Sequence, residues 1–162
     1  MLGQPSGNES SPRDDAIRLL ARREHSRREL AERLAAKGHA HEAIAECLDA
    51  LAEQGLQSDA RFAESFLRSR IQRGQGPMKI RGELERRGIE RELIGTAFAE
   101  SEQAGEGDWF ALAGEILARR FTGPGESPRE RARRERFLAS RGFDFDQVRH
   151  ALAHAWDSAP DQ

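Results

Sequence analysis

Residues that favour β-strands are scarce in this sequence of 162 residues. It contains one Val, seven Ile, two Thr and no Tyr, against 24 Ala and 15 Leu. β-branched and aromatic residues are enriched in strands, whereas Ala, Leu, Arg and Glu are good helix formers. The composition therefore excludes a sheet protein and predicts an all-α fold.

Cysteine and long apolar runs are equally scarce. Cys47 is the only cysteine, which excludes a disulfide framework and indicates a reducing compartment, the cytoplasm. No run approaches the ~20 apolar residues of a membrane span, so no membrane contact is expected. The polar start of the chain lacks the apolar stretch of a signal peptide. We expect a disordered leader over residues 1–13 and a loose tail over residues 158–162.

Motifs of catalysis and cofactor binding are missing. Neither G-x-x-x-x-G-K-[ST] nor G-x-G-x-x-G occurs, and no pair of carboxylates stands out. His150 and His154 have the i, i+4 spacing that could clamp a metal, but no glutamate lies between them and no third ligand is near. His39 and His41 flank an expected helix start and are expected to be exposed. From the sequence we expect that the protein binds no metal and no cofactor and is not an enzyme.

A repeat organises the chain. Three 24-residue segments align without gaps on a central glycine, and the apolar positions around that glycine recur at helical spacings. The segments are Arg28–Leu51 around Gly38, Met78–Ser101 around Gly88 and Ala132–Ala155 around Gly142. The recurring apolar residues are Leu34, Leu84 and Leu138 before the glycine, then Ile44, Ile94 and Val148, then Leu48, Phe98 and Leu152.

The repeated glycine marks the end of a helix. A basic residue precedes it each time, and a helix often ends with glycine in the left-handed conformation after a cation that suits the helix dipole. The residue after the glycine is expected to pack on the leucine four before it, as Ile89 on Leu84 and Phe143 on Leu138. A second helix follows each glycine.

A further helix precedes each pair. Segments Asp15–Arg23, Asp59–Arg70 and Asp108–Arg120 each begin with an acid and end in a basic turn. The starts of the later helices carry capping signals: Ser26 with Glu29, Pro77, Ser127 and Pro128 with Glu130, and Asp144 with Gln147. These signals predict about nine helices in three tandem three-helix repeats, arranged as an elongated array. The repeats are expected over residues 14–56, 57–105 and 106–157.

Two residue types in the repeats admit both a packing and a functional interpretation. Cys47 could be a reactive thiol, but the matching positions hold Ala97 and Ala151, which favours a small core residue. Phe62 and Phe66 could stack on bases, but their i, i+4 spacing is typical of the packing face of a helix.

Charge is segregated along the chain although the net charge is only −2. Residues 61–91 hold nine Lys or Arg against four Asp or Glu, and residues 119–141 hold eight against three, so each stretch carries +5. Residues 92–118 hold no base and six acids. Basic clusters are typical of surfaces that bind nucleic acid or an acidic partner, although many surface arginines are merely solvated. The candidate binding residues are Arg68, Arg70, Arg73, Lys79, Arg81 and Arg87 in the first stretch, and Arg119, Arg120, Arg131, Arg133, Arg134 and Arg141 in the second.

These features together resemble the bacterial RecX family over residues 14–156. The residues that carry the resemblance are Ser26-Arg27-Arg28-Glu29-Leu30 leading to Leu34 and Gly38; Phe62-Ala63, Phe66, Arg70, Gly74, Ile80, Leu84 and Gly88-Ile89; and Phe137-Leu138 with Arg141-Gly142-Phe143. The sequence departs from the family at Leu19-Leu20, where an aromatic Tyr-Leu pair is frequent. It also departs at Arg134, where Leu30 and Ile80 supply an apolar residue in the other repeats.

The resemblance implies a partner. RecX proteins bind the filament that RecA forms on single-stranded DNA and typically restrain its ATP hydrolysis and strand exchange, which would give this chain a regulatory role in recombination, DNA repair and the SOS response. A monomer with weak direct DNA binding would be expected. The residues themselves leave two alternatives open: a direct nucleic-acid-binding protein built from tandem helix-turn-helix-like units, and a plain helical scaffold.

Overall fold

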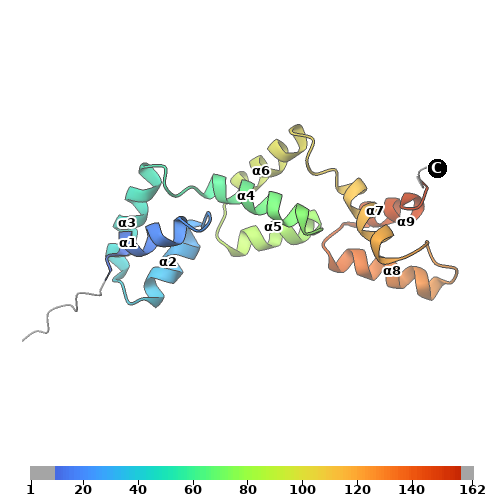
Figure 1. Cartoon of the computed structure of the whole chain (residues 1–162), viewed down its shortest axis with the longest axis horizontal. Coiled ribbons are helices and arrows are strands. Elements are labelled where there is room, and N and C mark those ends of the chain that lie inside the picture. The colour runs from blue at the N-terminus through green and yellow to red at the C-terminus, as the bar shows by residue number, and fades with distance from the viewer. Residues whose placement is uncertain (1–9, 158–162) are drawn as a thin grey trace, which may run out of the picture. The chain divides into compact units, whose positions relative to one another are not determined.

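The computed structural model describes residues 10–157 and contains nine helices and no strand within them, which confirms the all-α prediction. Residues 1–9 of the predicted leader and the whole predicted tail, residues 158–162, lie outside the described residues. The helices form three tandem three-helix repeats (Figure 1). They are α1 (Pro12–Leu20), α2 (Arg27–Ala36) and α3 (His41–Glu53); α4 (Asp59–Gln72), α5 (Pro77–Arg86) and α6 (Arg91–Gln103); α7 (Trp109–Arg120), α8 (Pro128–Ser140) and α9 (Phe145–His154).

The contacts of the chain divide it into two compact units. Within the described residues, unit 1 contains residues 10–62 together with Arg87–Ile89, and unit 2 contains Ala63–Arg86 and residues 90–157. Unit 2 thus holds most of the second repeat and all of the third.

The first helix differs from its prediction at both ends. It begins at Pro12, inside the expected leader, because the Ser11 hydroxyl accepts a hydrogen bond from the amide of Asp14 at 3.0 Å. It ends at Leu20 rather than Arg23, whose guanidinium instead binds the carboxylate of Glu29 at 3.3 Å. Ser11 and Pro12 form the same Ser-Pro start signal as Ser127 and Pro128 at α8.

The glycine turns and the caps agree with prediction. Gly38, Gly88 and Gly142 have φ of 93°, 85° and 98°. In the third repeat, the amide of Phe143 donates to the Leu138 carbonyl at 3.2 Å, the bond that closes a glycine-terminated helix. The predicted capping boxes are present at the starts of α2, α8 and α9.

Each repeat has buried apolar side chains at the predicted positions, except that Leu152 is only partly buried. In unit 1, α1, α2 and α3 pack around Leu30, Leu34 and Leu48, and Cys47 lies half-buried against this core. In unit 2, α7 packs chiefly on α9 around a second core: Ala113, Ile116, Leu117, Leu138, Phe143, Val148 and Ala151. The second repeat buries Phe62, Phe66, Leu67, Ile80, Leu84, Ile94 and Phe98. Phe62 and Phe66 are therefore core residues, as favoured above.

Membrane crossing has no structural basis in residues 10–157, where every helix is too short or too polar to span a bilayer.

Candidate nucleic-acid interface

The twelve predicted binding residues differ in exposure. Arg70, Arg87 and Arg134 are partly buried. The remaining nine are exposed: Arg68, Arg73, Lys79, Arg81, Arg119, Arg120, Arg131, Arg133 and Arg141. Exposure alone does not make a site, so the partners of each side chain decide which of them can meet a ligand.

Two of the partly buried arginines are held by carboxylates of the same chain. Arg70 lies 3.4 Å from a Glu83 oxygen, and its guanidinium stacks 4.5 Å from the centre of the Phe66 ring. Arg87 donates to Glu29 at 2.5 Å. Because both guanidinium groups already have a carboxylate partner, neither is well placed to bind a second anion.

Arg134 is also held within the fold. Its Nε donates to the Gly123 carbonyl at 2.7 Å and its Nη1 donates to the Glu130 carbonyl at 2.9 Å, while the guanidinium stacks 4.4 Å from the centre of the Phe121 ring. This clamp explains why the third repeat has arginine where the others have an apolar residue. The guanidinium fastens the loop after α7 onto α8.

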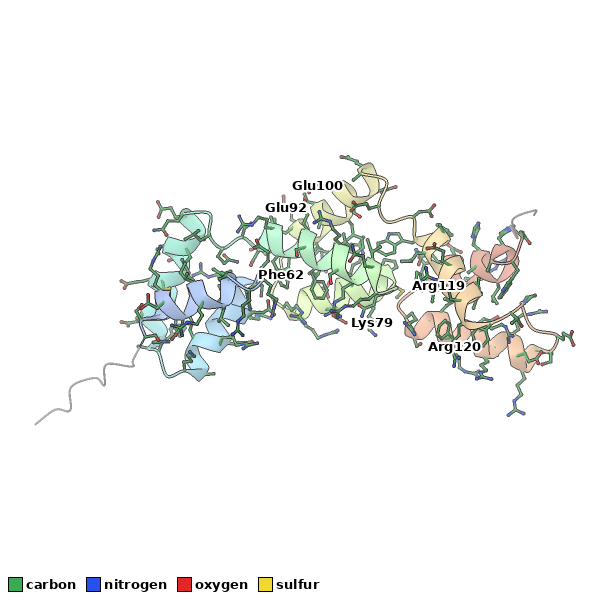
Figure 2. All side chains as sticks on the ribbon, viewed as in Figure 1. Phe62, Lys79, Glu92, Glu100, Arg119 and Arg120 are labelled. Atoms are coloured by element: carbon green, nitrogen blue, oxygen red, sulfur yellow. The ribbon has the colours of Figure 1, made fainter. Side chains whose placement is uncertain are left out.

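Four of the predicted arginines line one groove of about 470 Å³ in unit 2. Arg73 comes from the turn after α4, Arg119 and Arg120 from the end of α7, and Arg141 from the turn after α8. The end of α7 and Lys79, which lies on α5, are marked in Figure 2. The groove joins the first basic stretch of the sequence to the second.

The walls of the groove combine this charge with apolar surface. Ile71, Leu112, Ile116 and Phe137 line it, and Glu115 is the acid among its lining residues. The guanidinium of Arg141 lies 5.0 Å from the centre of the Phe137 ring. Planar guanidinium groups bind phosphate or carboxylate oxygens two at a time, so four of them around one acid make an anion-binding surface.

The other exposed predicted residues lie outside this groove. Arg68 is 3.9 Å from a Glu106 oxygen, and Arg81 stacks 3.9 Å from the centre of the Phe98 ring in a groove of about 670 Å³ that also contains acids. Lys79 lies at the start of α5 beside the Gly142 turn. Arg131 and Arg133 lie on α8.

Sequence reasoning missed the polar cluster of unit 1. The carboxylate of Asp15 is buried and lies 2.6 Å from His39 Nε2 and 3.2 Å from Lys37 Nζ. The expectation that His39 is exposed was wrong, because the contact with the Asp15 carboxylate holds the ring against α1. The acid in the first turn of α1 was visible, but the partner belongs to the turn after α2 and gave no local signal.

The described part of the chain offers neither a metal site nor an activated thiol. It holds no group of three or more His, Cys, Asp or Glu side chains that could bind a metal. The rings of His150 and His154 lie 4.7 Å apart, and His154 binds Asp157 at 2.8 Å. Burial raises the pKa of the Cys47 thiol, which lowers its fraction of reactive thiolate.

Comparison with known proteins places the chain among bacterial regulatory proteins. Sequence models of the RecX first, second and third three-helix domains match residues 13–51, 58–97 and 106–152. Regulatory protein RecX of Chromohalobacter salexigens is 65% identical over 153 residues, which cover 94% of this chain and 98% of that protein. The RecX protein of Halorhodospira halophila is 49% identical, covering 88% and 87%.

A crystal structure of RecX from Lactobacillus salivarius superposes with a TM-score of 0.72 and covers 89% of this chain and 94% of that one. Its sequence identity is 20%, so this match shows a shared fold.

Proposed function

The chain belongs to the RecX family of regulatory proteins, and from that premise we propose that it binds the filament of RecA on single-stranded DNA and inhibits its ATP hydrolysis and strand exchange. It acts as a monomeric regulator in recombination and repair and needs no cofactor.

One observation carries the proposal. The two basic stretches, separated by six acids in the sequence, converge on the groove formed by Arg73, Arg119, Arg120 and Arg141. A filament of protein on single-stranded DNA presents a row of phosphates, and guanidinium groups at the rim of a groove can neutralise several of them. We assign the binding of filament DNA to this groove.

The test compares charge reversals inside and outside the groove. The groove variant is Arg73→Glu, Arg119→Glu and Arg120→Glu together. The control variant is Arg22→Glu, Arg33→Glu and Arg91→Glu, which reverses three exposed arginines that have no ion pair within residues 10–157. We expect the groove variant to bind at least about tenfold more weakly, about 1.4 kcal/mol, and the control to bind like the wild type.

Binding is measured by the anisotropy of labelled single-stranded DNA coated with RecA and a slowly hydrolysed nucleotide, alongside the rate of RecA ATP hydrolysis. A well-folded groove variant that binds and inhibits like the wild type would contradict the assignment. Sequence-dependent binding to duplex DNA without RecA would instead support the helix-turn-helix-like alternative, and no binding to either would support a plain scaffold.

A further inference from the structure

Two glycine turns each dock onto the start of a helix, and in both the carbonyl of the residue before the glycine accepts a hydrogen bond from the same repeat position. In unit 1, the Ser26 hydroxyl donates to the Arg87 carbonyl at 2.8 Å, which holds the Arg87–Gly88 turn on the start of α2. In unit 2, the amide of Gly76 donates to the Arg141 carbonyl at 2.7 Å, which holds the Arg141–Gly142 turn on the start of α5. Ser26 and Gly76 occupy the same position of their repeats, twelve residues before the central glycine.

The turn in unit 2 is closely docked. A Cβ atom at Gly142 would come within 2.4 Å of Lys79 Cβ, and the amide of Met78 donates to the Gly142 carbonyl at 3.0 Å. This contact fixes the backbone of Lys79 against the backbone that carries Arg141.

The side chains at the two docked turns differ in charge. Glu29 and Lys79 occupy equivalent positions, nine residues before the glycine, and Arg87 and Arg141 each immediately precede one. The unit 1 turn therefore contains the Arg87–Glu29 ion pair. The unit 2 turn contains two exposed cations, Lys79 and Arg141, and no carboxylate of residues 10–157 lies within ion-pair distance of either.

We propose that Lys79 and Arg141 together bind one phosphate group of single-stranded nucleic acid, at the position that the Glu29 carboxylate fills in unit 1. A carboxylate and a phosphate oxygen are bound by the same charge-assisted hydrogen bonds, so the unit 1 turn shows the anion site in its occupied form. Arg141 also lines the groove formed with Arg73, Arg119 and Arg120, so this phosphate would be the next along the strand after the phosphates that those three arginines bind. The inference rests on the proposed function for the identity of the polymer.

The first experiment uses the matched arginines of the two turns. Arg141→Gln and Arg87→Gln remove the same side chain from equivalent positions. We expect Arg141→Gln to weaken binding to the RecA-coated strand and to a bare oligothymidine by several fold. We expect Arg87→Gln to leave both affinities unchanged, because its guanidinium is already paired with Glu29. Equal effects of the two variants would overturn the inference.

The second experiment supplies the missing carboxylate. Lys79→Glu recreates at the unit 2 turn the charge arrangement of unit 1, so the new side chain should pair with Arg141 and exclude the phosphate. Arg141→Gln should then cause no further loss in the Lys79→Glu background. It should keep its several-fold effect in an Arg91→Glu background, which reverses one exposed charge elsewhere. Helix content and melting temperature, read by circular dichroism, confirm that each variant is folded.

The outcomes separate this inference from the proposed function. If the wild type binds the filament but Arg141→Gln is equally harmful in both backgrounds, the shared phosphate site is wrong and filament binding stands. If the wild type binds oligothymidine but not the filament, the proposed function fails, and the two experiments on oligothymidine still decide the phosphate site. Binding to an acidic peptide but not to oligothymidine would overturn the site as a phosphate site.

Discussion

Asp15 is a buried carboxylate whose ionisation contributes to the stability of unit 1. The hydrogen bond with His39, followed by the one from Lys37, holds its pKa below the ordinary value, against the opposing effect of burial. A lowered pKa in the folded state means that the unfolded chain takes up the proton first as the pH falls. The stabilisation is therefore complete above the unfolded pKa of about 3.9 and is lost as the pH drops through the folded value.

We predict that Asp15→Asn lowers the melting temperature at pH 7 and makes it fall less steeply than that of the wild type below about pH 4. Thermal unfolding followed by circular dichroism at pH 7, 5 and 3 measures both effects. Asp14→Asn is the control, because Asp14 is an exposed neighbour on the same helix. Parallel pH profiles for the wild type and Asp15→Asn would contradict the role of this ion-pair cluster.

Leu84 shows how much a single core residue contributes. It is fully buried, at 0% exposed, whereas Leu56 is 42% exposed. We predict that Leu84→Ala lowers the free energy of unfolding by ~2–5 kcal/mol, because it leaves a cavity, and that Leu56→Ala changes it by less than about 0.5 kcal/mol. Urea unfolding measures both, and a cost below about half a kilocalorie for Leu84→Ala would show that this site can collapse.

At the scale of the element, Arg134 takes the position of an apolar residue of the other repeats and holds the loop after α7 against α8 by hydrogen bonds and ring stacking. We predict that Arg134→Ala lowers the free energy of unfolding by about 1–3 kcal/mol, since it removes a hydrogen bond to the Gly123 carbonyl and the stacking on Phe121. Arg133→Ala, at the exposed neighbouring position, should change it by less than about 0.5 kcal/mol. Urea unfolding tests both variants, and equal effects would contradict the clamp.

Most of the helical architecture could be predicted because its signals are local. A capping box such as Ser127 with Glu130 satisfies the first amides of its own helix, and Gly142 ends its helix through a φ that few other residues adopt. Both effects are encoded within a few residues of the boundary. The start of α1 was misplaced at Asp15 although Ser11 and Pro12 gave the same kind of signal.

The candidate site could be predicted only as two basic stretches. The sequence shows that Arg70 and Arg73 are close neighbours, but it does not show that the first meets Glu83 while the second reaches the groove. Those partners depend on the packing of α4 against other helices, which charge counts along the chain do not report. Reversing Arg68, Arg70 and Arg73 together would thus break two internal ion pairs, to Glu106 and Glu83, whereas the groove variant leaves both intact.

At the scale of the whole molecule, net charge is a poor guide to binding. A chain of net charge −2 is not expected to be drawn to a polyanion as a whole. The Debye length at physiological salt is about 8 Å, so a ligand in the groove responds to nearby guanidinium groups more than to distant acids. Local convergence of arginines can therefore produce binding that the total charge conceals.

The salt dependence of the affinity measures how many phosphates the arginines of the groove bind. We expect Arg73, Arg119 and Arg120 each to bind one phosphate, and Arg141 together with Lys79 to bind a fourth. Each phosphate of a single strand contributes about 0.7 to the slope of the logarithm of the affinity against the logarithm of the salt concentration, so the wild type should show a slope of about −3. The Arg73→Glu, Arg119→Glu, Arg120→Glu variant should retain a slope of about −0.7, for one phosphate. Titrations of the RecA-coated strand from low to physiological salt measure both. A shallow slope for the wild type would instead place these arginines against carboxylates of the protein partner, where few counterions are released.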